Sequence, residues 1–293
     1  MRKDYLAFLI SLFLSRLADQ ILLFIVPLIV FQTTNSVSWA GLAFFVESLP
    51  RYLAFPVCGA LCDKYPAVRI LHISQVYRAL ACVAAVLLYG MFDGIYWIVV
   101  LSALCGVLTT QGIMAREVLL PHIFKHYSYA KTLSYSQIAD QTGLVLGPLV
   151  AALMLGVWAW HWVVLGVAGL FLLADLAMRI WQRNTTVNLE TFEQHNDIWL
   201  QPLRIAFGHI RALPELKKII ALAVGVNLII GVTLATSAAL VIGQYAAGKD
   251  TYAGLQAAGA VVTIAILFYL ARASLPLKVL GGLSYSMIAV GAL

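Results

Sequence analysis

Long apolar stretches recur along the whole chain, each separated from the next by a polar connector. A helix that crosses a bilayer needs about 20 mostly apolar residues, and most of these stretches reach that length. Only 11% of the 293 residues are charged, against about 25% in a typical soluble domain, and the mean hydropathy is +0.91. We therefore predict an all-α polytopic membrane protein. The expected spans are Tyr5–Phe31, Val37–Leu61, Ile70–Met91, Ile95–Ala115, Thr132–Val157, His161–Trp181, Leu216–Gly243, Tyr252–Leu270 and a ninth that begins near Leu277.

Lys and Arg collect on alternate connectors. In this topology the connectors on the opposite side of the membrane carry only Lys249. Because positively charged loops remain in the cytoplasm, the N-terminus is predicted to be cytoplasmic. Trp39, Trp97 and Trp158 lie at the other ends of the spans, as in an interfacial aromatic belt. The net charge of +6 is therefore a topology signal, and no nucleic-acid partner is expected.

The spans divide into two unequal sets. We predict an N-terminal six-span bundle over residues 1–181, a cytoplasmic connector over 182–215 and an incomplete C-terminal bundle over 216–293. Within the connector, Ile198–Ala212 has an apolar face and a basic face, which fits either an interfacial helix or a partly ordered linker. Ser38–Leu42 and Thr251–Leu255 are similar and lie six spans apart, which indicates a parallel repeat of six-span halves. A second complete half would need about 100 further residues, so the chain is expected to be truncated at its C-terminus.

Two local motifs carry a family resemblance. The connector after the second span contains a glycine, an aspartate followed by a basic residue, and a later arginine: Gly59, Asp63, Lys64 and Arg69. The fifth span contains Gly143, Gly147 and Pro148, followed by alanines in place of a final glycine pair. Together with the two-halves pattern, these motifs resemble the major facilitator superfamily and its proton-driven exporters. The segment Gln111–Arg116 with Leu119–Pro121 is similar to the branch of enterobactin exporters and macrolide efflux pumps.

The resemblance implies a secondary transporter that exports a siderophore or drug-like small molecule by alternating access and proton antiport. It implies a monomer in the bacterial cytoplasmic (inner) membrane, with the small molecule, protons and lipid as partners and with no cofactor. The chain has no phosphate-binding loop of the Gly-x-x-x-x-Gly-Lys-(Ser/Thr) kind, and no span has catalytic spacing, so an enzyme is not expected. The alternative is a non-transporting or defective fragment or sensor of the same family, because the second half is incomplete.

Ionisable residues within the apolar spans are the candidate site. Each costs a few kcal/mol or more unless it is paired or hydrated, so these side chains must face the bundle interior or a wet cavity. They either bind protons and substrate or form interior ion pairs that fix the helices in register. For the proton and substrate role, the resemblance favours Asp19 with the neighbouring Gln20. Arg116 is a candidate for a gating latch with Asp63, or an ordinary cytoplasmic anchor. The candidates for proton coupling or substrate are Arg16, Asp19, Gln20, Glu47, Arg51, Arg78 and Asp140.

No metal site is expected. Cys58 and Cys62 are one helical turn apart, but no third ligand is nearby. His122 and His126 have the same spacing within a basic connector. With Cys82 and Cys105, the cysteines fit small buried apolar residues better than a disulfide framework.

Overall fold

The structure is a computed structural model. It describes residues 3–34, 37–92, 94–123, 129–184 and scattered positions between 208 and 262. The chain divides into two compact units, residues 1–196 and 197–293, and the boundary falls within the predicted connector. Most of the predicted interfacial helix and of the predicted second half lies outside the described residues. The helices of the first unit are α1 (Lys3–Thr34), α2 (Val37–Leu53), α3 (Phe55–Lys64), α4 (Ala67–Phe92), α5 (Ile95–Ile123), α6 (Tyr129–Val157) and α7 (Trp160–Asn184).

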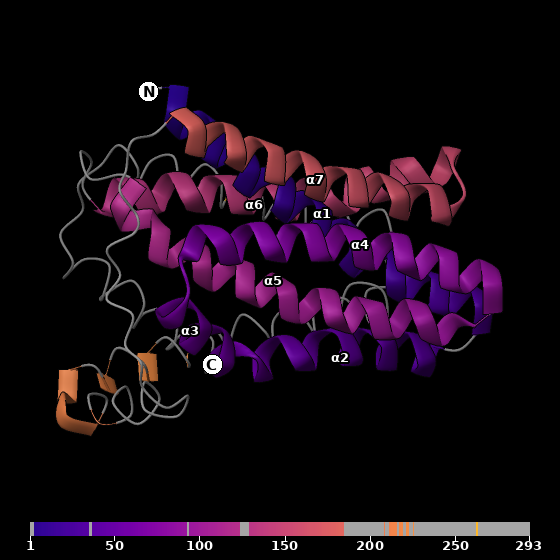
Figure 1. The fold of residues 1–293 in the computed structure, drawn as a ribbon. Helices are drawn as coiled ribbons and strands as arrows, with labels where there is room; N and C mark the ends of the chain where they lie inside the picture. The colour runs from indigo at the N-terminus through magenta and orange to yellow at the C-terminus, as the bar shows by residue number, and fades with distance from the viewer. Residues whose placement is uncertain are drawn as a thin grey trace. The chain divides into compact units, whose positions relative to one another are not determined.

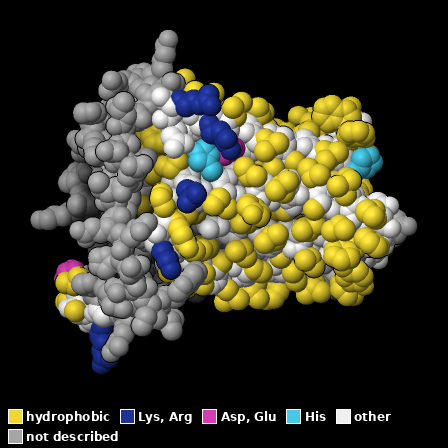
Figure 2. Space-filling view, viewed as in Figure 1, with side chains coloured by type: hydrophobic (Ala, Val, Ile, Leu, Met, Phe, Trp, Pro, Cys, Tyr) yellow, Lys and Arg dark blue, Asp and Glu magenta, His cyan; other side chains and the backbone are white. Residues whose placement is uncertain are grey.

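Five of these helices are long and apolar enough to cross a membrane: α1, α4, α5, α6 and α7. Each contains one of the predicted spans. Hydrophobic side chains cover most of the face shown in Figure 2, and Lys and Arg gather at one end. Leu153 and Met91, for example, are 73% and 74% exposed. Large apolar side chains turned outward in this number fit a lipid environment better than water.

The predicted second span, Val37–Leu61, is divided between α2 and α3. The division lies at Ala54, between Pro50 within α2 and Pro56 in the first turn of α3. Proline removes a backbone donor and crowds the preceding turn, so two prolines six residues apart interrupt a regular helix. The chain direction nevertheless continues, because the Ala54 N–H donates to the Pro50 carbonyl at 2.9 Å and the Cys58 N–H donates to the Ala54 carbonyl at 2.8 Å.

Helix α1 lies at the centre of the first unit. It packs against α6, α7 and α2, while α4 lies beside α5 and α7 (Figure 1). Ala18, Ile21 and Ile25 of α1 are fully buried in the larger apolar core, together with Phe171 of α7. A helix surrounded on several sides must be apolar around most of its circumference, as α1 is. Any polar residue that α1 carries at this depth therefore faces another helix.

Small residues set the approach of α6 to α1. A methyl group added at Gly143 would meet the Arg16 side chain at 3.0 Å, and one added at Gly147 would overlap the Cβ of Gln20. These are the glycines of the fifth-span motif, and Pro148 lies beside them within α6. The close approach of the backbones sets the register of α1 against α6, and with it the positions of Arg16, Asp19 and Gln20 along the bundle.

Candidate functional site

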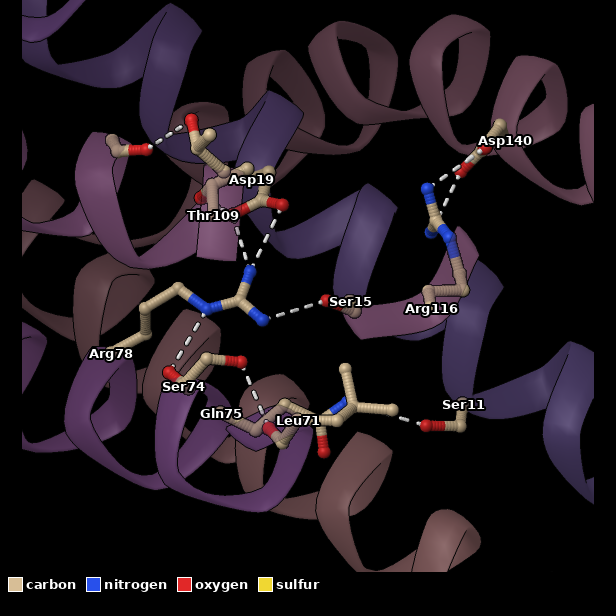
Figure 3. Close-up of polar contacts among 12 residues, drawn as sticks. Ser11, Ser15, Asp19, Leu71, Ser74, Gln75, Arg78, Thr109, Arg116 and Asp140 are labelled. Atoms are coloured by element: carbon tan, nitrogen blue, oxygen red, sulfur yellow. Dashed lines mark hydrogen bonds and ion pairs between the residues drawn. The ribbon is translucent and has the colours of Figure 1, made fainter. Parts of the chain in front are cut away.

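A buried ion pair joins α1 to α4. Nη1 of Arg78 donates to both carboxylate oxygens of Asp19, at 2.9 and 3.0 Å, and the Thr109 hydroxyl of α5 donates to Oδ1 at 2.8 Å (Figure 3). Asp19 is 5% exposed and Arg78 is 1% exposed. Three helices therefore meet at one carboxylate. Removing one partner from a buried pair of this kind typically costs about 3–5 kcal/mol, since the other charge is left without compensation.

The other two nitrogens of Arg78 also donate hydrogen bonds. Nη2 donates to the Ser15 hydroxyl at 3.1 Å, and Nε donates to the Ser74 carbonyl at 3.1 Å. The guanidinium lies over the Phe171 ring of α7, 4.5 Å from its centroid. A cation desolvated in this way gains from the negative face of the ring. Arg78 is thus held in one position by groups from α1, α4 and α7.

A second ion pair joins α5 to α6. Nη1 and Nη2 of Arg116 donate to the two carboxylate oxygens of Asp140, both at 3.2 Å (Figure 3). Its side chains are less buried than those of the first pair, at 11% and 15% exposure. The sequence offered Asp63 as the partner of Arg116. In this structure Arg116 pairs with Asp140, and since the side chain of Asp63 lies outside the described residues, the latch stays a prediction.

The other charged candidates surround these two pairs. Arg16 interacts electrostatically with Asp140 and Asp19, and also with Arg116 and Arg51. Glu47 of α2 is 2% exposed and lies near Ser102 and Arg51. Gly106 of α5 allows this approach, because an added methyl group there would lie 2.6 Å from the Glu47 carbonyl. Within the described residues, Nε of Arg16 and Oε2 of Glu47 are buried without a hydrogen-bond partner.

A small cavity of about 20 Å³ lies between these helices. Room for a single water molecule requires about 10–15 Å³ by the same measure, so the cavity accommodates water but not an organic substrate. Its polar lining is contributed by α1, α4 and α5, and its apolar lining includes Phe8, Leu12, Leu71 and Ile113. The polar side chains that line it are Ser11, Ser15, Arg16, Asp19, Gln75, Arg78, Thr109 and Arg116.

The family model of the Major Facilitator Superfamily matches residues 8–293. The chain belongs to the Major Facilitator Superfamily. No curated protein that was compared with the chain matches it. Family membership makes this a multi-pass membrane transporter of small molecules, and it places the buried charges within a transport protein.

The structure brings together most of the residues predicted for the transporter. Five of the charged candidates lie close enough to interact electrostatically: Arg16, Asp19, Glu47, Arg51 and Arg78. Asp140 interacts with Arg16 and is paired with Arg116. Gln20 is buried and contacts α6 at Gly147. The connector residues lie apart from this group: Gly59 and Lys64 belong to α3, and Arg69 is exposed in the first turn of α4.

Apart from Gln20, the sequence predictions missed the uncharged part of the site. Ser15, Ser74, Gln75 and Thr109 all contact Asp19, Arg78 or the cavity between them. A signal was available, since Ser11, Ser15 and Asp19 recur every four residues and so share one face of α1. Hydroxyl and amide groups are common in transmembrane helices, so such a face is weaker evidence for a functional site than a buried charge is.

A further cluster lies nearer the surface of the transporter. Asp175 of α7 accepts a hydrogen bond from Nε of Arg179, one helical turn further along, at 2.7 Å. The other oxygen of Asp175 contacts Nδ1 of His72 on α4, a residue that the sequence did not single out. Nε2 of His72 lies 3.1 Å from Oε1 of Gln182. This cluster ties the beginning of α4 to the end of α7.

The described residues contain no group of three or more His, Cys, Asp or Glu side chains that would hold a metal ion. Cys58, Cys62, Cys82 and Cys105 are buried and are not joined in disulfides. Cys82 and Cys105 belong to the larger apolar core, as small hydrophobic side chains do.

Proposed function

We propose that this transporter exports a small molecule in exchange for protons and that Asp19 carries the proton. The observation that supports the proposal is the carboxylate of Asp19, buried in an apolar bundle and bound by both Arg78 and Thr109. An ionisable group at this depth is costly and is usually found in transport proteins on an ion pathway.

The pair offers a physical basis for coupling. A carboxylate accepts both hydrogen bonds from Nη1 of Arg78, whereas a protonated carboxyl group has lost the charge that binds the guanidinium. Protonation of Asp19 therefore weakens the link between α1 and α4, while the contacts of Arg78 to Ser15, Ser74 and Phe171 persist. Since α1 also packs against α6 and α7, the change would be transmitted to the helices around it.

The substrate is proposed to be a siderophore or a drug-like compound, bound alternately from either side of the membrane. Arg16, whose Nε is buried without a hydrogen-bond partner within the described residues, favours an anionic group on a substrate bound beside it. We place the protein in a bacterial inner membrane with its N-terminus in the cytoplasm, as the distribution of basic residues indicates. We further propose that it acts as a monomer.

The test uses everted membrane vesicles that contain the full chain. An imposed proton gradient is followed with a pH-sensitive dye while macrolides and an iron-free catecholate siderophore are added in turn. We expect at least one compound to release protons from the vesicles, and the Asp19→Asn variant to lose this response. The Thr142→Val variant is the matched control, because the Thr142 hydroxyl donates to the Ile138 carbonyl within α6 and lies outside the site.

Stable, inserted protein that moves no proton with any of these compounds would count against the exchange of protons for this substrate class. A proton response that survives Asp19→Asn would instead remove Asp19 from the role of carrier. The two outcomes separate the transport proposal from the assignment of its residue.

A further inference from the structure

Two arginines of the site form no ion pair within the part of the chain that the structure describes: Arg16 of α1 and Arg51 of α2. Arg78 and Arg116, by contrast, are each held by an aspartate. The Nε atoms of Arg16 and Arg51 are also buried without a hydrogen-bond partner among the described residues. A guanidinium group is a donor at all three nitrogens, and a buried donor left unpaired costs free energy.

Neighbouring helices hold the stems of these two side chains. A methyl group added at Gly143 of α6 would meet Cβ and Cγ of Arg16 at 3.0 Å, so the stem fills the space between the helices. One added at Gly106 of α5 would lie 3.8 Å from Cβ of Arg51. The Thr110 hydroxyl of α5 also donates to the Arg51 carbonyl at 2.9 Å. The base of each side chain is therefore fixed, while its charged end has no partner among the described residues.

Positive charge is in excess around Arg16 and Arg51. The two guanidinium groups lie close enough to repel one another. Arg16 also interacts with Asp19 and Asp140, but the carboxylate oxygens of both are bonded to the other two arginines. Arg51 interacts with Glu47, one helical turn earlier on α2. Two cations thus share one carboxyl group that no other arginine holds, and like charges at this depth are costly unless a further group compensates them.

We propose that Arg16 and Arg51 together bind the anionic group of the transported compound, and that this compound is an organic carboxylate or sulfonate. Arginine presents a planar fork of N–H donors that matches the oxygens of such a group. The proposal rests on the transport function proposed above and narrows its substrate, because a neutral or cationic compound would leave the excess charge uncompensated.

The two side chains are suited to a ligand that arrives from outside the small cavity. Both are half-buried, so their guanidinium ends remain accessible although Nε is buried. The cavity of about 20 Å³ beside Arg16 admits water only, so the anion meets the arginines from their accessible side. Since the stems are already held by α5 and α6, binding has little further ordering to impose, which favours affinity.

The test measures binding to the full chain in a nonionic detergent by isothermal titration calorimetry, without a proton gradient. The probes are naphthoate, naphthalene sulfonate and the neutral naphthamide, which share one aromatic body. We expect both anions to bind more tightly than the amide. Arg16→Gln and Arg51→Gln should each weaken binding of the anions by about tenfold or more, as expected for the loss of a hydrogen bond to a charged group, and leave binding of the amide unchanged.

Arg183→Gln is the matched control, because it removes the same charge from an exposed position in the last turn of α7. It should bind all three probes as the wild type does. If Arg16→Gln does not fold, Arg16→Lys keeps the stem beside Gly143 and the charge but loses the planar fork, and weaker binding of both anions is still expected.

Equal affinity for the three probes, or no binding of any of them, would overturn the site. Binding of the anions that neither substitution weakens would overturn the assignment to Arg16 and Arg51. Because no gradient is applied, these results are separate from the vesicle assay. Proton exchange with another compound would survive the loss of this site, and the site would survive a chain that binds the anions but exchanges no protons.

Discussion

The Asp19–Arg78 pair makes a quantitative prediction about stability. Arg78→Met replaces the cation with an apolar side chain. The carboxylate of Asp19, which is 5% exposed, then keeps the hydrogen bond from Thr109 but loses both hydrogen bonds from Arg78. Breaking a buried pair from one side costs about 3–5 kcal/mol. The double variant Asp19→Asn with Arg78→Met contains no buried charge at this position, and the carbonyl of the new amide would still accept the hydrogen bond from Thr109. We therefore expect the double variant to recover about 2–3 kcal/mol relative to the sum of the single variants.

The less buried pair of Arg116 and Asp140 is the matched control. Its side chains are 11% and 15% exposed, against 2% and 6% for Arg78 and Asp19, so the charge that remains when one partner is removed is less completely desolvated. Arg116→Met and Asp140→Asn should therefore give a smaller coupling free energy than the first cycle.

Both cycles are measured by reversible unfolding of the full chain in mixed micelles, with tryptophan fluorescence as the signal. If the effects of Asp19→Asn and Arg78→Met on the free energy of unfolding simply add, the two residues are not energetically coupled and the argument from burial fails. Equal coupling in the two cycles would contradict the ranking by exposure.

Two further predictions use the same protein. Gly147→Ala should lower the free energy of unfolding by about 1–3 kcal/mol, since the new methyl group overlaps Gln20. Gly156→Ala on the same helix has open space around it and should change the free energy of unfolding by less than about 1 kcal/mol. Equal effects of the two substitutions in micelle unfolding would refute the packing argument. A cysteine at exposed Arg183 should react with a membrane-impermeant maleimide only from the cytoplasm, and one at exposed Trp158 only from the other side; the reverse pattern in sealed cells and everted vesicles would invert the proposed topology.

The positions of the long helices could be predicted from the sequence because a span is set by local composition. The α-helices from Ala67 to Phe92 and from Trp160 to Asn184 each contain a predicted span and extend a few residues beyond it. The division at Ala54 was not predicted, although Pro50 and Pro56 were visible. An apolar run has the same hydropathy whether its backbone is regular or broken, so hydropathy alone does not detect the break.

Partner choice within the site could not be predicted in the same way. Asp19 and Arg78 are 59 residues apart, and Arg116 pairs with Asp140 on the next helix. The sequence indicated that each charge needs a partner or water, because an isolated charge in an apolar bundle is costly. Which partner it finds depends on helix rotation and on the close approach of α6 to α1 at Gly143 and Gly147. These are properties of the packed bundle and have no local signature.

The two ion pairs differ in a way that matters for a moving protein. The Asp19–Arg78 pair joins α1, α4 and α5 and is almost completely buried, whereas the Arg116–Asp140 pair joins α5 to α6 and is partly exposed. The less buried pair is less completely desolvated, so separating it during a conformational change costs less. A buried pair separates at low cost only if one of its charges is neutralised first. A proton arriving at Asp19 is a simple means of neutralising it, as the proposed carrier role of Asp19 requires.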